Sequence, residues 1–436
     1  MTNRNRLAAA VLAVSSLALL SACGGGSGGT TSRSGGNTIT GTASNVASVA
    51  VNAGPGDLVG GTTNTAFVSV NVCTHGTSTC QTLPFVAVDT GSAGLRILKS
   101  KLTVSLTQEN DTGGNPIFEC NLFVDGFTWG PVQTADVTIA GTSETATNIP
   151  VQIVDDSATP AVPPSQSCAA SSLGGSDNSL SGLGAYAILG VGNFRQDCGF
   201  ACTLSSFGTN ANPGIYYSCP TSNCTTQIPV SFAQQLQNPV ALFPTDNNGS
   251  ILELPAVSTE GASLTGSLVF GIGTQSNNAT PSPSHVILLD SAGTFVTLFS
   301  PLNQGQQQFP GSFLDSGSNG YFFLDNSYDP RLVVCASPNQ DFYCPTNTLS
   351  LNVSNTDDNG LVTLNSTIKV ANANGLPNNA ALDNLGGPNI NPNPQPGQPT
   401  TSFDFGLPFF YGRNVYTALE GVSNGAPTDQ GQYVSY

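Results

Sequence analysis

One short motif occurs twice in this 436-residue chain and limits the possible folds more than any other feature. An apolar run leads directly into Asp-Thr-Gly-Ser at Asp89 and into Asp-Ser-Gly-Ser at Asp315. The glycine lets the chain turn with its backbone close to the carboxylate, and the flanking hydroxyls can donate hydrogen bonds to that carboxylate. The repeat therefore predicts two related halves, each of which presents one carboxylate at the end of a buried strand.

The two aspartates suggest a specific chemistry if they meet across an interface. Two adjacent carboxylates cannot both ionise cheaply, so the pair shares a proton and titrates as a unit. The ionised member can then take a proton from a bound water, while the other member protonates the carbonyl oxygen of an amide. Such a site hydrolyses a peptide bond without a metal or a histidine, so we expect no cofactor.

These residues resemble the loops of the pepsin-like aspartic peptidases, and the resemblance covers most of the chain beyond about residue 64. In that family, a strand that ends in two apolar residues and a glycine runs beside each loop. Residues 187–192 would fill this place after Asp89, and residues 410–412 would fill it after Asp315. The resemblance implies an all-β, bilobal pepsin-like aspartic-peptidase fold with few short helices. The chain also resembles a group of bacterial lipoproteins with the same two loops, and that likeness supplies no activity.

The resemblance also implies a role for each residue of the two loops. Asp89 and Asp315 would be the catalytic pair of an endopeptidase that acts on a peptide or an unfolded protein. Thr90 and Ser316 would brace the loops against each other, and the serines two residues further on would donate hydrogen bonds to the carboxylates. The supporting set is Thr90, Gly91, Ser92, Ser316, Gly317 and Ser318.

Two departures from the family pattern keep other interpretations open. The family's flap, a hairpin over the cleft, usually carries a Tyr, whereas the flap candidates here are Phe123, Phe127 and Trp129. Arg96 stands where many members have a Trp. One alternative is therefore a non-catalytic envelope lipoprotein of the same fold that binds a peptide, a glycan or a protein partner in its cleft. Another is a cell-surface β-protein in which the two Asp loops are only turns.

The N-terminal residues 1–23 are typical of a lipoprotein signal peptide. A basic start precedes an apolar run that is short for a membrane span. The run ends in Leu-Ser-Ala-Cys, which resembles the bacterial lipobox, so Cys23 is the expected lipidation site; an ordinary cleavable signal is the alternative. Because Gly24 rather than Asp follows, we expect a cell-envelope protein at the outer membrane, facing the periplasm or the exterior. Its contact with the membrane would be the lipid anchor alone.

The composition changes along the chain after this signal. Residues 24–59 are rich in Gly, Ser, Thr and Asn and are predicted to be a flexible tether. Beyond them, short apolar runs broken by Gly, Asn and Pro predict strands and turns. We expect a monomer with an N-terminal β lobe over 60–245, carrying the Asp89 loop, and a C-terminal β lobe over 246–436, carrying the Asp315 loop. The strand candidates include 66–72, 85–88, 137–139, 240–243, 251–254 and 267–270.

Charge and histidine content exclude several classes of function. The formal net charge of −16 argues against nucleic acid as a partner, because binding to phosphates needs basic groups. The two histidines, His75 and His285, are far apart in the sequence and lie in turn-rich segments. With no paired Cys-x-x-Cys motifs beside them, the sequence predicts no metal site and no histidine-based nucleophile.

The cysteines indicate an oxidising compartment. Eleven are present, and lipidation of Cys23 would leave an even ten for disulfides. Spacing favours neighbouring partners, although it does not exclude other pairings. The candidate pairs are Cys73 with Cys80, Cys198 with Cys202, Cys219 with Cys224, Cys335 with Cys344, and Cys120 with Cys168.

Overall fold

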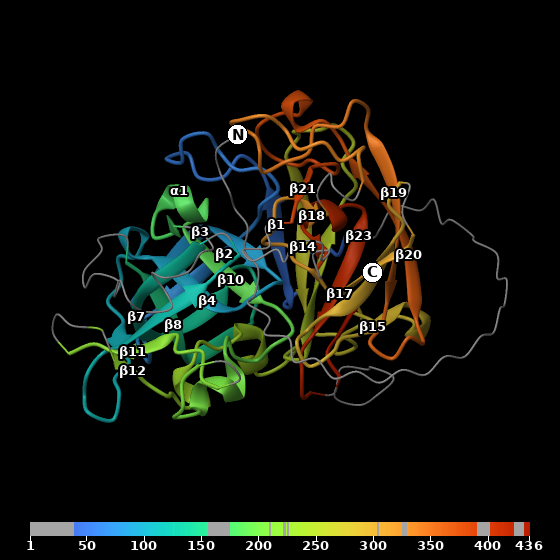
Figure 1. Cartoon of the computed structure of the whole chain (residues 1–436). Helices are drawn as coiled ribbons and strands as arrows, with labels where there is room; N and C mark the ends of the chain where they lie inside the picture. The colour runs from blue at the N-terminus through green and yellow to red at the C-terminus, as the bar shows by residue number, and fades with distance from the viewer. Residues whose placement is uncertain are drawn as a thin grey trace.

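In the computed structural model, the regular structure of the described residues is almost all β-strand, as predicted (Figure 1). The structure describes residues 39–124, 126–155, 175–208, 211–220, 224, 226–302, 305–324, 329–389, 402–422 and 431–436. The one α-helix of these residues, α1, spans Leu180–Leu183. No helix in the described ranges is long and apolar enough to cross a membrane.

Strands are interspersed with short 3-10 turns along the described chain. The first twelve strands are β1 Val46–Val51, β2 Ala66–Cys73, β3 Cys80–Asp89, β4 Ala93–Leu98, β5 Thr107–Gln108, β6 Ile117–Leu122, β7 Gly126–Ile139, β8 Thr145–Val154, β9 Gly175–Ser176, β10 Ala187–Val191, β11 Tyr216–Ser218 and β12 Thr226–Gln227. The next twelve are β13 Gly249–Leu254, β14 Leu264–Phe270, β15 Val286–Leu288, β16 Phe295–Phe299, β17 Gln307–Leu314, β18 Tyr321–Phe323, β19 Leu349–Thr356, β20 Thr363–Val370, β21 Gly386–Pro388, β22 Asp404–Phe405, β23 Arg413–Ala418 and β24 Tyr433–Ser435. Single 3-10 turns are η1 Lys99–Lys101, η2 Gly199–Thr203, η3 Phe232–Gln234, η4 Pro239–Leu242, η5 Pro283–His285, η6 Ala373–Gly375 and η7 Leu407–Phe409.

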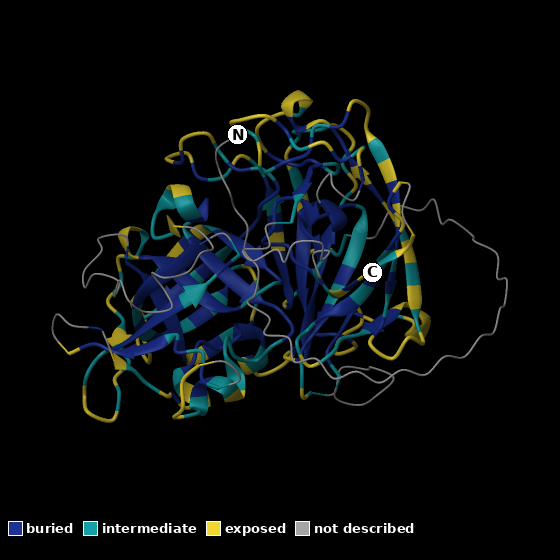
Figure 2. Ribbon diagram, viewed as in Figure 1, coloured by how far each residue is buried: buried dark blue, intermediate teal, exposed yellow. Residues whose placement is uncertain are grey.

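The strands form two lobes that share one core. The strands from β2 onward that are blue to green in Figure 1 form one lobe, and the later strands (yellow to red) form the other, with the blue β1 beside β14. Figure 2 shows that strands of both lobes are largely buried, with exposed residues mainly in turns and along β19 and β20. A single cluster of buried apolar side chains includes Val70 and Leu95 of the first lobe and Phe309 and Phe405 of the second. Burial of this apolar surface is the main force that holds the lobes together.

Strand β1 connects the lobes and corrects one prediction. Residues 46–51 lie in the predicted tether, but they form a strand that pairs antiparallel with β14 over its whole length. The end of β1 also pairs with β2 at Ala50 and Val51. Ala47, Val49 and Val51 are buried in the shared core, so an alternating apolar pattern is present within a polar-looking segment. The predicted signal, Cys23 and tether residues 24–38 lie outside the described residues.

Five of the six strand candidates named above lie in strands, and one does not. Residues 240–243 fall in the 3-10 turn η4 and at its end rather than in a strand. The reason is local: Pro239 occupies the first turn, and the side chain of Asn238 accepts a hydrogen bond from the amide of Val240 at 3.1 Å. These residues favour a capped turn over an extended strand.

Four of the five predicted disulfides are confirmed: Cys73–Cys80, Cys198–Cys202, Cys219–Cys224 and Cys335–Cys344. Cys120 is also disulfide-bonded. Its predicted partner, Cys168, lies outside the described residues. Each confirmed bridge closes a short loop, which restricts the unfolded chain locally.

A buried carboxyl pair lies where the first lobe meets the chain that leads into the second. Glu144, between β7 and β8, hydrogen-bonds to Asp246, which precedes β13. Burial and the charge of Asp246 raise the pKa of Glu144 to about 7. The pKa of Glu260, paired with Asp383, and that of Asp177 are also raised to about 7, mainly by burial.

Each of these three carboxyls stabilises the fold more in acid than at neutral pH. A carboxyl whose pKa is higher in the folded state stabilises the fold at low pH, and that contribution is lost as the pH rises toward 7. Glu144→Gln mimics the protonated acid, so we expect it to raise the Tm at pH 8 by about 3 °C or more and to leave the Tm at pH 5 unchanged. Calorimetry at both pH values tests this, with Glu109→Gln in the same lobe as the matched control. An equal shift at both pH values would contradict the prediction.

Candidate functional site

Parallel strands present both aspartates of the repeated motif. In the first lobe, β10 runs parallel to β3, and Gly190 lies opposite Asp89 at the end of β3. A Cβ atom on Gly190 would lie 2.7 Å from the backbone of Ala93, so only glycine fits there. The expected strand beside the first loop, residues 187–192, is therefore confirmed.

The second lobe repeats this arrangement, but with a different glycine from the one predicted. Strand β22 runs parallel to β17, and the amide of Asp315 donates to the carbonyl of Phe405 at 3.0 Å. Gly406 follows, and a Cβ atom on it would lie 2.2 Å from the carbonyl oxygen of Gly320. The prediction for residues 410–412 is wrong, because the turn η7 intervenes and Gly412, at φ 74°, turns the chain into β23.

Thr90 and Ser316 join the two loops by four reciprocal hydrogen bonds. The amide of Thr90 donates to Ser316 Oγ at 3.1 Å, and the amide of Ser316 donates to Thr90 Oγ1 at 2.9 Å. The hydroxyl of Thr90 donates to the carbonyl of Leu314 at 3.1 Å, and that of Ser316 donates to the carbonyl of Val88 at 2.7 Å. All four bonds are buried, and they hold the loops in one relative position.

Within each loop, the glycine amide and the second hydroxyl bind the carboxyl group, as predicted. This donor set orients both carboxyls and stabilises negative charge on them. The bonds are Gly91 N to Asp89 Oδ1 (2.8 Å), Ser92 Oγ to Asp89 Oδ2, Gly317 N to Asp315 Oδ1 (2.8 Å) and Ser318 Oγ to Asp315 Oδ2 (2.9 Å).

The two carboxyls face each other and share a hydrogen bond. Both aspartates are 0% exposed, and a Cβ atom on Gly91 would lie 2.6 Å from Cγ of Asp315. Burial raises the pKa of Asp89, although hydrogen bonds with Ser92 and Asp315 oppose this shift. Burial raises the pKa of Asp315 much further, because the charges of Asp89 and Asp404 act in the same direction. The two carboxyls therefore titrate as a pair, which keeps a proton to higher pH than an isolated aspartate would.

Sequence reasoning missed Asp404, which is a third acid at this site. It begins β22, lies opposite Phe313 and is buried. Its Oδ2 atom lies 2.6 Å from Ser318 Oγ, within hydrogen-bond distance. The signal that could have found it is the sequence Phe-Asp-Phe-Gly, in which an apolar residue and a glycine follow the acid as they follow Ile188 in the first lobe.

The three flap candidates do form part of a hairpin, β6–β7, but their side chains are packed inside the first lobe. Trp129 is 0% exposed and packs against Phe118 and Tyr217, with ring centroids 5.4 and 5.3 Å away. Phe127 belongs to the same apolar cluster, and Phe123 is buried in a neighbouring one. The three aromatic side chains are therefore structural residues of the lobe, which was the alternative to a flap role for Trp129, because each side chain gains apolar burial there.

Arg96 is buried beneath this hairpin and explains the second departure from the family pattern. Its guanidinium donates to Ala93 O, Glu119 Oε1 and Asn121 Oδ1, each at 2.9 Å, and lies 3.6 Å from Asp197. Burial acts to lower the pKa of Arg96, but the charges of Glu119 and Asp197 outweigh it and raise the pKa. The cation therefore ties β4 to the flap hairpin, and its charge opposes the rise in the pKa of Asp89.

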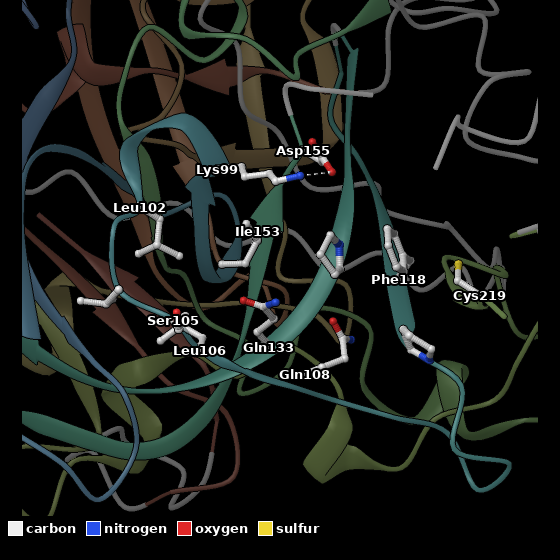
Figure 3. A pocket seen from close by; sticks show the side chains of 13 residues that line it. Lys99, Leu102, Ser105, Leu106, Gln108, Phe118, Gln133, Ile153, Asp155 and Cys219 are labelled. Carbon is white, nitrogen blue, oxygen red and sulfur yellow. Dashed lines mark hydrogen bonds and ion pairs between the residues drawn. The ribbon is translucent and has the colours of Figure 1, made fainter. Parts of the chain in front are cut away.

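One small cavity borders the Asp loops, and a larger groove lies elsewhere on the described surface. The small cavity of about 40 Å³ borders Thr90 and Ser92 and extends to Thr294 of the second lobe, with room for about one water molecule. The larger groove of about 520 Å³ lies on the first lobe and includes no residue of either Asp loop. Figure 3 shows Lys99 and Asp155 paired at one side of this groove, with a nitrogen–oxygen distance of 2.9 Å. The groove is therefore separate from the carboxyl pair.

Each lobe delivers one Asp loop, and reciprocal hydrogen bonds through hydroxyl groups join the two loops. This arrangement defines the all-β, bilobal fold of the pepsin-like aspartic peptidases. The chain itself belongs to the family described as "Protein of unknown function (DUF3443)", whose family model matches residues 41–436. It is similar to the crystal structure of an aspartic proteinase from Irpex lacteus, with 16% identity and a TM-score of 0.44, over 89% of this chain and 97% of that one. A comparison with curated protein sequences finds no match.

Proposed function

We propose that this chain is a secreted, lipid-anchored aspartic endopeptidase of the bacterial envelope. The observation that carries the proposal is the buried, proton-sharing pair of Asp89 and Asp315, held by reciprocal bonds between two loops. The confirmed disulfides support an oxidising compartment, and the lipobox-like Cys23 supports the lipid anchor. The substrate would be a peptide or an unfolded protein.

The larger rise in the pKa of Asp315 supports the following division of the two catalytic roles. Asp89, as the charged member, accepts a proton from water, whose oxygen then forms a bond to the carbonyl carbon of the substrate. Asp315 gives its proton to the carbonyl oxygen, so the tetrahedral intermediate is neutral at that oxygen. Asp89 then passes its proton to the amide nitrogen, Asp315 recovers its own, and the carbon–nitrogen bond breaks. The pair returns to its initial charge.

Cleavage of a peptide library by the purified protein, from pH 3 to 8, tests this function. We expect cleavage that is blocked by a pepstatin-like inhibitor, which mimics the tetrahedral intermediate. The reaction needs one proton on the pair, so activity should be low in acid, where both carboxyls are protonated, rise as the first proton leaves, and fall again when the pair loses its second proton. Absence of both cleavage and inhibitor binding across this range would reject the proposal.

Full burial of the carboxyl pair favours a second candidate, a non-catalytic protein of the same fold. Asp89 and Asp315 are 0% exposed, so a substrate can reach them only if covering residues move. A binding protein would need no such access, and its buried pair would serve only to hold the lobes together. In that case Asp89→Ala would leave the binding of a peptide, glycan or protein partner intact, whereas a peptidase would lose cleavage completely.

A further inference from the structure

A third carboxyl is linked to the pair through one hydroxyl. Ser318 Oγ lies 2.9 Å from Asp315 Oδ2 and 2.6 Å from Asp404 Oδ2. All three side chains are buried, with Asp404 only 7% exposed. The strand pairing explains this closeness, because β22 runs parallel to β17 and brings Asp404 beside the strand that ends at the second Asp loop.

The hydrogen bonds in this arrangement determine how many of the three carboxyls are protonated. A hydroxyl has one hydrogen, so Ser318 can donate fully to only one of its two neighbours. The other carboxyl must carry a proton and donate it to Ser318 Oγ. Without that proton, its carboxylate oxygen and the hydroxyl oxygen would repel each other strongly in a buried site. The hydrogen bond between Asp89 and Asp315 needs a proton of its own. Three carboxyls therefore require two protons.

The corresponding position of the first lobe carries no acid. Ile188 lies opposite Ala87, two residues before Asp89, just as Asp404 lies opposite Phe313, two residues before Asp315. Ile188 is buried in an apolar cluster. Of these two equivalent positions, only the one beside Asp315 adds a carboxyl, so the pair is electrostatically asymmetric.

Among the described residues, the two strands that pair with β22 place no charged side chain beside Asp404. Of the strands beside it, β17 has no titratable side chain and β18 has only Tyr321, which stays neutral because burial raises its pKa. The acids that act on Asp315 are Asp89 and Asp404, and the cation Arg96 acts on Asp89. Removal of Asp404 should therefore be felt mainly by Asp315.

We propose that Asp404 is a positioning residue that joins the catalytic pair through Ser318, so that three carboxyls share two protons and titrate as one unit. Asp404 raises the pH at which Asp315 loses its proton, because Asp315 would then become negative beside another negative charge. The consequence for catalysis rests on the proposed function, whereas the sharing of protons does not.

Carbon-13 NMR of aspartate carboxyls in the full-length protein tests the proposal without requiring activity. Asp404→Asn keeps the shape of the side chain, and Asp404→Ile places there the residue of the equivalent first-lobe position. We expect either variant to lower the apparent pKa of Asp315 by about one unit or more. The control Asp358→Asn removes an exposed carboxyl of the same lobe and should leave Asp315 unchanged.

The wild type supplies a measurement that does not depend on any variant folding. At pH 6 we expect two of the three carboxyls to be protonated, and a single protonated carboxyl would overturn the proposal. An unchanged titration of Asp315 in a folded Asp404 variant would overturn it too. If the protein cleaves peptides, Asp404→Asn should also move the basic limb of kcat/KM down by about one pH unit. If it cleaves nothing, the titration still decides this proposal, and only the peptidase function fails.

Discussion

Asp89→Asn is expected to reduce peptide-bond cleavage at least about 10³-fold, because the group that accepts a proton from water is lost. Asparagine has almost the same shape, and its oxygen can still accept the 2.8 Å hydrogen bond from the amide of Gly91. Its neutral amide cannot take a proton, so the water stays unactivated. The fold should survive, since the change removes a charge from a buried site where charge is costly.

Steady-state kcat with a cleaved peptide, together with the Tm, separates chemistry from folding. Asp358→Asn provides the matched control, because it makes the same chemical change at an exposed position of the second lobe. Asp315→Asn should lose activity to a similar extent, since it removes the proton donor. A folded Asp89→Asn protein that keeps a tenth or more of the wild-type kcat would show that the dyad does not perform the reaction.

The sequence was sufficient to predict those parts of the site that depend on neighbours along the chain. The apolar run before each aspartate predicts a buried strand, and the glycine and hydroxyls after it predict the donors that hold the carboxyl. The bracing role of Thr90 and Ser316 was implied by the resemblance to the pepsin-like peptidases, and the reciprocal bonds agree with it. The repeated local chemistry therefore predicted the carboxyl pair, and the resemblance supplied the fold class.

Features that depend on distant pairing were missed or misplaced. Asp404 reaches Ser318 from 86 residues away, and only the parallel pairing of β22 with β17 brings them together. The same pairing identifies Gly406, where sequence spacing suggested Gly412. Strand β1 was hidden because its partner β14 lies in the other lobe. In each case the deciding contact is a tertiary one, which residue spacing does not encode.

The hydrogen bonds between the loops all depend on the side chains of Thr90 and Ser316. Thr90 Oγ1 donates to the carbonyl of Leu314 at 3.1 Å and accepts from the amide of Ser316 at 2.9 Å. Thr90 is buried, so water cannot replace it as a partner for either backbone group. A buried donor or acceptor that loses its partner costs about 1–3 kcal/mol. Because these bonds span the lobes, their loss also frees the two carboxyls to separate.

Thr90→Val keeps the size of the side chain but removes its hydroxyl, and we expect it to lower the free energy of unfolding by about 2–4 kcal/mol. At about 2–4 °C per kcal/mol, the Tm should fall by about 5–15 °C. Thr90→Ser retains the hydroxyl and should change the Tm by less than about 3 °C. Calorimetry at pH 5, where the buried carboxyls of Glu144 and Glu260 are largely protonated, provides the comparison. Equal losses in both variants would mean that the methyl group of Thr90, rather than its hydrogen bonds, joins the loops.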